Sequence, residues 1–337
     1  MKKYTLGLVL CFLLSSIAFA QKNNQSMSKK YKTAGSIERL DPAINSLIPE
    51  GAEIEILASG FDWSEGPLWL ESQSALIFSD VPANKIYRWS EKDGLSVYLE
   101  PSGYFGERRD KKEPGSNGLT LDNEGNLILC QHGLRQLGKM RSGLENPEET
   151  YETLADSWKG NKFNSPNDVV IHKNGGIYFT DPPYGLDPWD EKELEFQGVY
   201  RLLDGELKLE IEDLYRPNGV ALNPDHSILY VAQSDPEMAR YYEYKLSESG
   251  EVQEGKILLD VSHLISDERR GLPDGLKVHS SGNVFATGPG GVLVISPIGK
   301  ILGTILTGQA TANCAFDADE NYLYMTADMH LMRIKLK

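Results

Sequence analysis

The sequence predicts an all-β fold, a six-bladed β-propeller whose four-stranded blades surround a central channel. Three observations predict it: a sixteen-residue pattern occurs six times, each copy has the layout of a two-strand hairpin, and further strand-like segments separate the copies. Repeats of roughly 40 to 50 residues built from strands are typical of propeller blades. A mixed β-sandwich with chance similarities is the alternative, and six copies in phase count against it.

The six copies of the pattern start between 39 and 56 residues apart, at Glu65 first and at Asn313 last. In chain order they read EGPLWLESQSALIFSD, NGLTLDNEGNLILCQH, NDVVIHKNGGIYFTDP, NGVALNPDHSILYVAQ, DGLKVHSSGNVFATGP and NCAFDADENYLYMTAD. Each copy continues from its first residue into an apolar-rich strand, then a turn, then a second strand. Gly and Asn in the turns supply the backbone conformations that tight hairpins need.

Outer strands complete each blade. Strand-like segments between the copies lie at 85–89, 198–202, 241–244, 291–295 and 330–334. Two strands of each copy and two outer strands make a four-stranded blade. We expect residues 36–337 to form this single propeller domain. Residues 36–62 and the C-terminal strand must share the closure of the ring, and the sequence leaves open which strands pair.

Two segments outside the strands are long enough to shape the rim of a pocket. Residues 104–114, YFGERRDKKEP, form a charged insertion between the first two copies. Residues 186–196 follow the third copy, and we expect a short helix over 188–196. Trp63, Trp69 and Trp89 are interpreted as packing residues near the first blade.

The N-terminus resembles a secretory signal peptide over residues 1–20. Two lysines precede a short apolar segment, and Ala18-Phe19-Ala20 is a small-x-small cleavage site. A retained membrane anchor is the alternative, but the segment is shorter than the roughly 18 apolar residues of a spanning helix. Residues 21–35 are polar and are expected to be a flexible lead-in. The sequence thus predicts an exported protein, periplasmic or extracellular, without a membrane partner after cleavage.

Charge and cysteine content exclude several classes of function. The net charge is −15, and loss of the signal peptide makes it −17 because two lysines and no acid are removed. Such an acidic chain repels phosphate backbones and anionic lipids, which disfavours nucleic-acid and membrane partners. Only Cys130 and Cys314 lie beyond the signal peptide, on blades that are not neighbours, so we expect two buried free thiols rather than a disulfide.

The residue that opens each copy carries a side-chain oxygen. These residues are Glu65, Asn117, Asn167, Asn218, Asp274 and Asn313. In a propeller they occupy equivalent places and would converge on one opening of the channel. A single Asn before a strand is an ordinary turn residue, but six such residues around a ring make an oxygen-lined cavity.

Glu65 and Asp274 would place two carboxylates in that cavity. Crowded carboxylates repel each other unless a cation lies between them or one keeps its proton. Oxygen-only ligation suits a hard divalent cation, Ca²⁺ first and Mg²⁺ second. Zn²⁺ stays possible, although no His or Cys stands at these positions. The alternative is that the asparagines only cap strands and fix turns.

Six short motifs fall in order at blade spacing. They are FDWSEGP at 61–67, SPND at 165–168, YFTDPPYG at 178–185, RPNG at 216–219, PDGL at 273–276 and TANC at 311–314. From about residue 50 to the C-terminus the chain resembles the gluconolactonase/regucalcin (SMP-30-like) family, and most closely its bacterial gluconolactonase-like branch. The resemblance implies one divalent cation, usually calcium, at the channel mouth. It implies that Glu65, Asn167, Asn218 and Asp274 are the ligands.

The resemblance also implies an activity, a lactonase that opens a sugar-derived lactone with water. The cation would act as a Lewis acid on the carbonyl, and Asp274 would activate the water, or would be only a ligand. Asn117 and Asn313 could hydrogen-bond sugar hydroxyls, and Tyr184 could line the pocket. His132 could bind the substrate, shuttle a proton or play a structural role.

Two other functions stay open at this point. One is a non-catalytic propeller that binds a sugar or a protein, because fold alone does not establish chemistry. The other is a phosphotriesterase-type hydrolase that uses the same cation. The sequence determines neither the particular lactone nor the oligomeric state.

Overall fold

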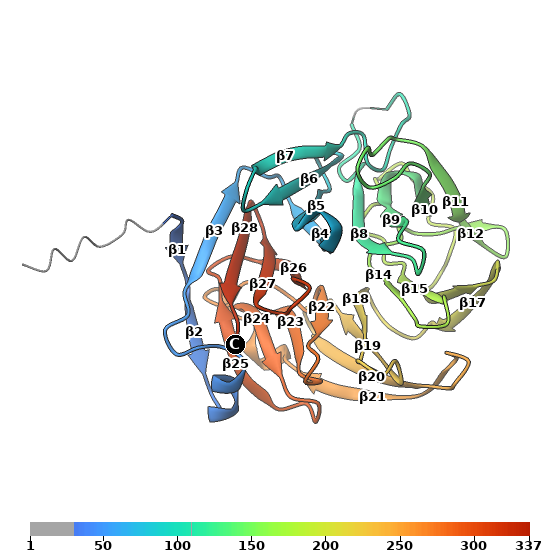
Figure 1. Ribbon diagram of the computed structural model, residues 1–337. Coiled ribbons are helices and arrows are strands. Elements are labelled where there is room, and N and C mark those ends of the chain that lie inside the picture. The colour runs from blue at the N-terminus through green and yellow to red at the C-terminus, as the bar shows by residue number, and fades with distance from the viewer. Residues whose placement is uncertain (1–29, 109) are drawn as a thin grey trace, which may run out of the picture. The chain divides into compact units, whose positions relative to one another are not determined.

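Six antiparallel sheets follow one another in the computed structural model, which describes residues 30–108 and 110–337 (Figure 1). Each sheet supplies one blade around a common centre, and the predicted six-bladed propeller is confirmed. Residues 31–337 form one compact unit. The predicted signal peptide and residues 21–29 of the predicted lead-in lie outside the described residues.

Four blades are consecutive four-stranded meanders. The first is β4 (Ser64–Leu70), β5 (Ala75–Asp80), β6 (Lys85–Ser90) and β7 (Gly94–Leu99). The second is β8 (Ser116–Leu121), β9 (Leu127–Gln131), β10 (Gln136–Met140) and β11 (Tyr151–Ala155). The third is β14 (Val169–Ile171), β15 (Ile177–Thr180), β16 (Val199–Leu203) and β17 (Glu206–Ile211), after the small hairpin β12 (Ser157–Trp158) and β13 (Asn161–Lys162). The fourth is β18 (Pro217–Leu222), β19 (Ile228–Gln233), β20 (Arg240–Leu246) and β21 (Val252–Asp260).

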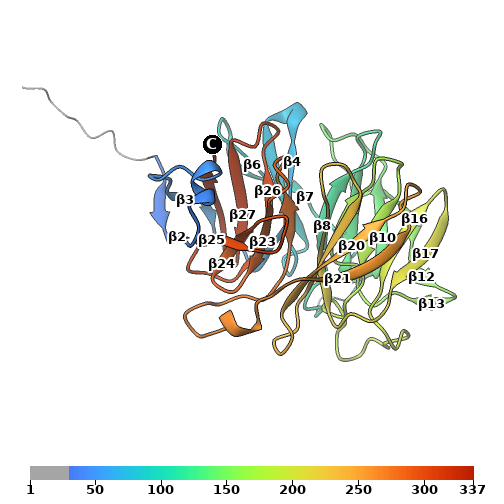
Figure 2. The same ribbon diagram turned by 90° about the horizontal axis from the view of Figure 1, so that it is seen from below.

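The last two blades close the ring with strands from both ends of the described chain. The fifth contains β22 (Leu276–Val278), β23 (Val284–Gly288), β24 (Gly291–Ile295) and β25 (Ile301–Leu306), with β2 (Ser36–Arg39) outside β25. The sixth contains β26 (Thr311–Phe316), β27 (Tyr322–Ala327) and β28 (His330–Lys335), followed outward by β3 (Ile54–Ser59) and β1 (Lys32–Ala34). Figure 2 shows these N-terminal strands beside the C-terminal ones.

This closure answers the pairing question that the sequence left open. Ile54 pairs with Ile334 and Ser59 with His330, so β3 supplies the fourth strand of the sixth blade. β1 then covers the edge of β3, and β2 covers the edge of β25, which leaves fewer unpaired strand edges. The last residues of the expected lead-in over 21–35 include β1, which is hydrogen-bonded to β3.

The innermost strands form the wall of the channel. Each one contacts the innermost strand of the next blade, in the order β4, β8, β14, β18, β22, β26 and back to β4. Apolar residues of neighbouring blades fill the space between the sheets, and Cys130 and Cys314 are buried there in two different clusters as free thiols, as expected. The ends of the innermost strands are thereby held at fixed positions around one opening.

The described residues contain no α-helix, and four short 3-10 helices are the only helical segments there. These are η1 (Pro42–Ser46), η2 (Glu71–Gln73), η3 (His132–Leu134) and η4 (Ser262–Leu264). The helix expected over 188–196 is absent, because Asp187 and Asp190 fold into a tight turn in which the Asp187 N–H donates to Asp190 Oδ2 at 3.0 Å. In the described part of the chain, no helix combines the length and apolarity needed to cross a membrane.

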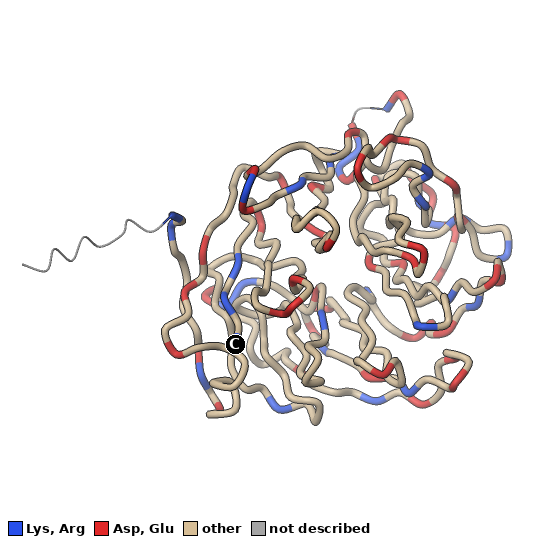
Figure 3. Tube along the Cα trace, viewed as in Figure 1, with Lys and Arg blue, Asp and Glu red and all other residues tan. Residues whose placement is uncertain are grey.

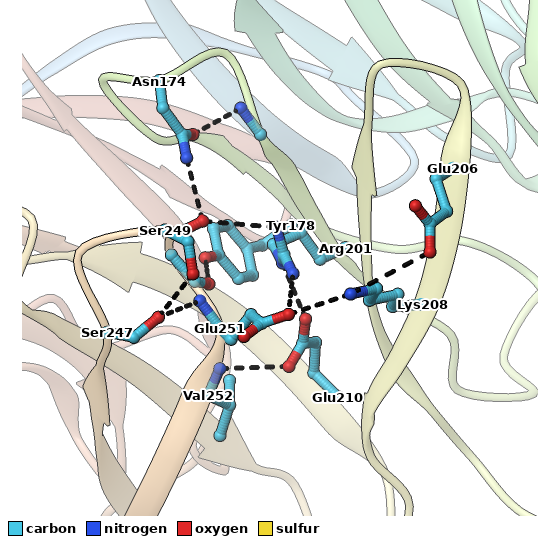
Figure 4. A network of polar contacts seen from close by, with 12 residues as sticks. Asn174, Tyr178, Arg201, Glu206, Lys208, Glu210, Ser247, Ser249, Glu251 and Val252 are labelled. Carbon is cyan, nitrogen blue, oxygen red and sulfur yellow. Dashed lines mark hydrogen bonds and ion pairs between the residues drawn. The ribbon is translucent and has the colours of Figure 1, made fainter.

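Charged residues lie on every blade, with acids and bases interspersed (Figure 3). One group of them joins the outer strands of the third and fourth blades (Figure 4). Arg201 Nε on β16 donates to Glu210 Oε1 on β17 at 2.6 Å, and both side chains are buried. Glu210 Oε2 accepts a hydrogen bond from the N–H of Val252 on β21 at 3.0 Å, so Glu210 links the third blade to the fourth.

Candidate active site

The ring residues predicted from the sequence gather at one opening of the channel. Five of the six line a single cavity of about 270 Å³, namely Glu65, Asn117, Asn167, Asn218 and Asp274. The four on the first four blades are at most 5% exposed. Asn313 lies behind this wall, where its side-chain amide hydrogen-bonds the Glu65 carboxylate while its Oδ1 accepts the Cys314 N–H at 2.9 Å.

Backbone irregularities at the strand entrances turn these side chains inward. The pairing between the first two strands of a blade shifts register just after Glu65, around Asn117 and Asn218, and just before Asn313. A β-bulge of this kind bends the strand and redirects a side chain, and such bulges are common beside active sites. In these four copies the polar residue is thus turned out of the regular sheet pattern, whereas Asn167 and Asp274 precede the strands β14 and β22.

The glycine that follows several ring residues has a packing cause. A Cβ on Gly66 would lie 2.0 Å from the Asn117 carbonyl oxygen, and Gly66 has a φ of +49°. A Cβ on Gly219 would lie 2.2 Å from the Asp274 carbonyl oxygen. Only glycine lets the neighbouring blade approach this closely, so the Glu-Gly and Asn-Gly pairs bring successive ring residues together.

Two carboxylates, the buried Glu65 and the half-buried Asp274, dominate the electrostatics of the cavity. Burial raises the pKa of Glu65, and burial together with the Glu65 charge raises the pKa of Asp274. Asp274 Oδ1 is buried and has no hydrogen-bond partner among the described residues. Asp168, one residue after Asn167, adds a third negative charge, and its Oδ2 accepts the Val220 N–H at 3.1 Å. An unpartnered oxygen among repelling carboxylates fits a bound divalent cation.

The donors available for a cation are all oxygens. The described residues hold no group of three or more His, Cys, Asp and Glu side chains that could hold a metal ion. The candidate site therefore combines two carboxylates, Glu65 and Asp274, with the amide oxygens of asparagines. Carboxylate and amide oxygens match the preference of Ca²⁺ and, with fewer protein ligands, of Mg²⁺.

His132 does not line the cavity. It is fully buried behind Asn167, with Nδ1 3.0 Å from Glu113 Oε2 and Nε2 3.5 Å from Asn167 Nδ2. If the Asn167 amide donates to Nε2, Nδ1 carries the imidazole proton and donates to Glu113. The Asn167 amide group then points its nitrogen at His132 and leaves its oxygen for the cavity. Tyr184 does line the cavity, and its hydroxyl bonds the side chains of Ser234 and Asn218.

Several lining residues escaped the sequence analysis. They are Glu113, Arg216, Ser234 and Thr311, together with Trp63, which was interpreted as a packing residue and instead lies on the cavity wall. Glu113 comes from the charged insertion over 104–114, whose path the sequence does not specify. Arg216 opens the RPNG motif that contains Asn218. Its position two residues before a predicted ring residue could have indicated that it also lies near the cavity.

The insertion that carries Glu113 is fastened to the loop after β15. Lys111 Nζ lies 3.0 Å from Asp187 Oδ2 and 3.0 Å from Asp190 Oδ2, and its side chain is buried. The N–H of Lys112 donates to Asp187 Oδ1 at 3.1 Å, and Arg108 stacks on Trp189. This contact, named the rim latch, holds Glu113 at the mouth of the cavity.

Loss of the rim latch is expected to weaken substrate use. A Lys111→Met variant should lose roughly 10-fold in kcat/KM, because small displacements of a positioning group are costly. Lys112→Met is the matched control, since its side chain is exposed and the bond to Asp187 comes from its backbone. Steady-state kinetics on a hydrolysed lactone measure the effect. Equal kinetics for the two variants would show that the latch has no part in substrate binding.

The stability of the metal-free protein is expected to fall as pH rises from about 5 to 8. A carboxyl group whose pKa is raised in the folded state binds its proton there and loses it in the unfolded state near pH 4, so ionisation at higher pH costs folding energy. Glu65 and Asp274 contribute, and burial also raises the pKa of Asp181 to about 7. Thermal unfolding in chelator across this range tests the sign. A Glu65→Gln/Asp274→Asn variant should show a flatter profile, and an unchanged slope would contradict the assignment.

The fold and the cavity define a class of protein, a six-bladed propeller with an acidic, oxygen-lined pocket at one mouth of its channel. Residues 63–328 match the family model described as SMP-30/Gluconolactonase/LRE-like region, and the chain belongs to that family. The expected family is thereby confirmed.

Named relatives agree with this placement. The gluconolactonase of Zymomonas mobilis subsp. mobilis is 37% identical over 336 residues, which cover 96% of this chain and 91% of that protein. The solved structure of a gluconolactonase from Xanthomonas campestris has a TM-score of 0.78 at 28% identity, covering 91% of this chain and 97% of that one. Regucalcin from Agrobacterium tumefaciens, described as a calcium-binding protein, has a TM-score of 0.65 at 15% identity over 84% of this chain and 94% of that one, and shares the fold. The name gluconolactonase denotes a lactonase, a carboxylic ester hydrolase.

Proposed function

We propose that this protein hydrolyses a sugar-derived lactone with a divalent cation bound by Glu65, Asn167, Asn218 and Asp274. One observation carries the proposal: the carboxylates of Glu65 and Asp274 line a single cavity, and the buried Asp274 Oδ1 has no partner among the described residues. Such an arrangement stores repulsion that a bound cation relieves. The gluconolactonase relatives supply the reaction class.

The cation is proposed to be Ca²⁺, with Mg²⁺ and Zn²⁺ as alternatives, because all candidate donors are oxygens. When bound, such a cation polarises a carbonyl oxygen as a Lewis acid. The chain itself prepares the site: His132 orients the Asn167 amide, Tyr184 hydrogen-bonds Asn218, and Asn313 fixes the Glu65 carboxylate.

Asp274 is proposed as the group that accepts the proton of the attacking water. A new bond forms between the water oxygen and the carbonyl carbon while the proton passes to the carboxylate. The bond from that carbon to the ring oxygen then breaks, and the ring oxygen takes the proton held by Asp274 to become a hydroxyl, which restores the Asp274 carboxylate. The product is an open-chain hydroxy acid, which ionises and releases one proton to solvent.

Substrate contacts come from the rest of the wall. Asn117 and Tyr184 can hydrogen-bond sugar hydroxyls, and the Glu113 carboxylate can accept from them. Trp63 offers an aromatic surface for the ring of the sugar. We also propose export to the periplasm or the exterior, which rests on the signal-like residues 1–20 alone.

A lactone panel assayed by proton release, with and without chelator, tests the proposal. The expected result is hydrolysis of at least one aldonolactone that chelator abolishes and Ca²⁺ restores. Binding of a sugar without turnover of any lactone would favour a non-catalytic propeller. Faster turnover of organophosphate triesters than of lactones would favour the phosphotriesterase alternative. Full activity in chelator would contradict the proposed metal dependence.

A further inference from the structure

The cavity contains a cationic side chain that the proposed reaction does not use. Among the described residues that line the cavity, Arg216 is the one Lys or Arg. Within residues 30–108 and 110–337, no carboxylate, carbonyl or hydroxyl accepts a hydrogen bond from its guanidinium, which lies 5.3 Å from the centre of the Tyr215 ring and whose charge acts on Tyr184. A guanidinium has five donors and is always charged, so its donors face the cavity without a partner from the chain.

The backbone of Arg216 is held firmly. Its N–H donates to Gln197 Oε1 at 2.9 Å, and its carbonyl oxygen accepts the Ser234 N–H at 2.9 Å. Arg216 has a φ of +55°, in the left-handed region that non-glycine residues rarely adopt. Gln197 is itself buried, so this conformation is built into the wall of the fourth blade. The point at which the side chain leaves the backbone is therefore set by the fold.

Arg216 does not serve to neutralise the acids of the site. The charges that act most strongly on Asp274 are those of Glu65, Asp168 and Glu113, all negative, whereas the charge of Arg216 acts on Tyr184. The cavity wall thus carries both signs of charge, with the carboxylates of Glu65, Glu113 and Asp274 as one part and the Arg216 guanidinium as the other. Its volume of about 270 Å³ lies at the small end of ligand pockets, so one monosaccharide-sized molecule would reach both parts.

We infer that Arg216 is an anion-binding subsite, and that the preferred substrates are lactones that carry a second, anionic group away from the lactone carbonyl. This inference rests on the proposed function. The anionic group is a carboxylate or a phosphate, because a guanidinium binds either one in a two-pronged contact. A neutral aldonolactone fits the cation end but leaves the guanidinium without an anionic partner.

Kinetics on three lactones test the inference: a neutral aldonolactone, the monolactone of a sugar diacid, and a phosphorylated aldonolactone. In the wild type, kcat/KM should be at least about 10-fold higher for one of the anionic lactones, and which one identifies the group. In Arg216→Gln, the ratio of anionic to neutral kcat/KM should fall about 10- to 150-fold through KM, the range of one charge-assisted hydrogen bond. Arg216→Lys should recover part of the ratio, because the charge stays and the two-pronged contact is lost.

Arg240→Gln is the matched control, since Arg240 lies on the same blade and donates to Asp260 Oδ2 at 2.7 Å, away from the cavity residues. It should leave the ratio unchanged. The inference would be overturned if the wild type hydrolysed anionic and neutral lactones equally well, or if Arg216→Gln lost activity on both kinds of lactone equally. Either result would leave the proposed function standing. A wild type that hydrolyses no lactone would overturn the proposed function.

A binding measurement distinguishes failure of the anion subsite from failure of the proposed lactone hydrolysis. Calorimetric titration of the open-chain sugar diacid and of a neutral sugar alcohol needs no turnover. Tighter binding of the diacid to the wild type than to Arg216→Gln is expected. Equal binding to both proteins would overturn the anion subsite independently of catalysis.

Discussion

An Asp274→Asn variant is expected to lose about 100- to 10,000-fold in kcat for lactone hydrolysis while keeping its fold. The amide cannot take the proton of the attacking water, and it is a weaker ligand for a cation than a carboxylate. In the absence of metal the same variant should be more stable than the wild type. The reason is that it removes one of two carboxylates that repel each other and an oxygen without a partner.

The comparison of activity and stability makes this prediction specific. Proton-release kinetics measure kcat, and urea unfolding in chelator measures the free energy of unfolding. Asp62→Asn is a suitable control, because it changes a nearby acid that does not line the cavity. Full turnover by Asp274→Asn would refute the role of Asp274 as proton acceptor. A metal-free variant less stable than the metal-free wild type would refute the repulsion between the Glu65 and Asp274 carboxylates.

An Arg201→Met variant is expected to lose about 3 to 5 kcal/mol of unfolding free energy. Arg201 and Glu210 form a buried ion pair at 2.6 Å, with side chains 4% and 8% exposed (Figure 4). Removing the guanidinium leaves the Glu210 carboxylate buried with the Val252 N–H and no remaining cationic partner at that distance. Urea denaturation monitored by tryptophan fluorescence measures the loss.

Two variants of the same network control for this prediction. Lys208 and Glu251 form a pair at 2.8 Å whose side chains are 43% and 45% exposed. Because exposed pairs contribute little, Lys208→Met should cost less than about 1 kcal/mol. Arg201→Met/Glu210→Leu should recover most of the loss, since no charge is left buried. Equal losses for Arg201→Met and Lys208→Met would contradict a special role for burial.

The fold was predictable because each blade repeats one local pattern. A polar residue, a strand, a turn and a second strand can be identified without long-range information, and six repeats require a ring. The closure was not predictable in the same way. β2 and β3 pair with strands about 270 residues further along the chain, and nothing in their local sequence specifies whether β3 joins β28 or β25.

The candidate site was predictable to the extent that it lies on the repeat. Glu65, Asn117, Asn167, Asn218 and Asp274 hold equivalent positions in successive blades, so symmetry brought them to one cavity. Residues that reach the cavity by other routes were missed. Glu113 arrives on an insertion that the rim latch positions, and Trp63 lies just before β4, outside the repeated pattern.

His132 shows that the place of a residue in the chain does not determine whether its side chain lines the cavity or lies behind the residues that do. It was expected to bind the substrate, shuttle a proton or play a structural role, and its side chain contacts Asn167 and Glu113 without lining the cavity. The same holds for Asn313, which hydrogen-bonds Glu65 in place of facing the cavity. The repeat predicts where a backbone position lies, but the neighbouring side chains decide which atoms the cavity exposes.

Equilibrium binding of Ca²⁺ to protein stripped with chelator tests the central claim, that carboxylates from distant blades jointly bind one divalent cation. Calorimetric titration should give one ion per chain for the wild type, with binding greatly weakened in both Glu65→Gln and Asp274→Asn. Wild-type protein that binds no divalent cation, or binds one equally well after both substitutions, would contradict the account.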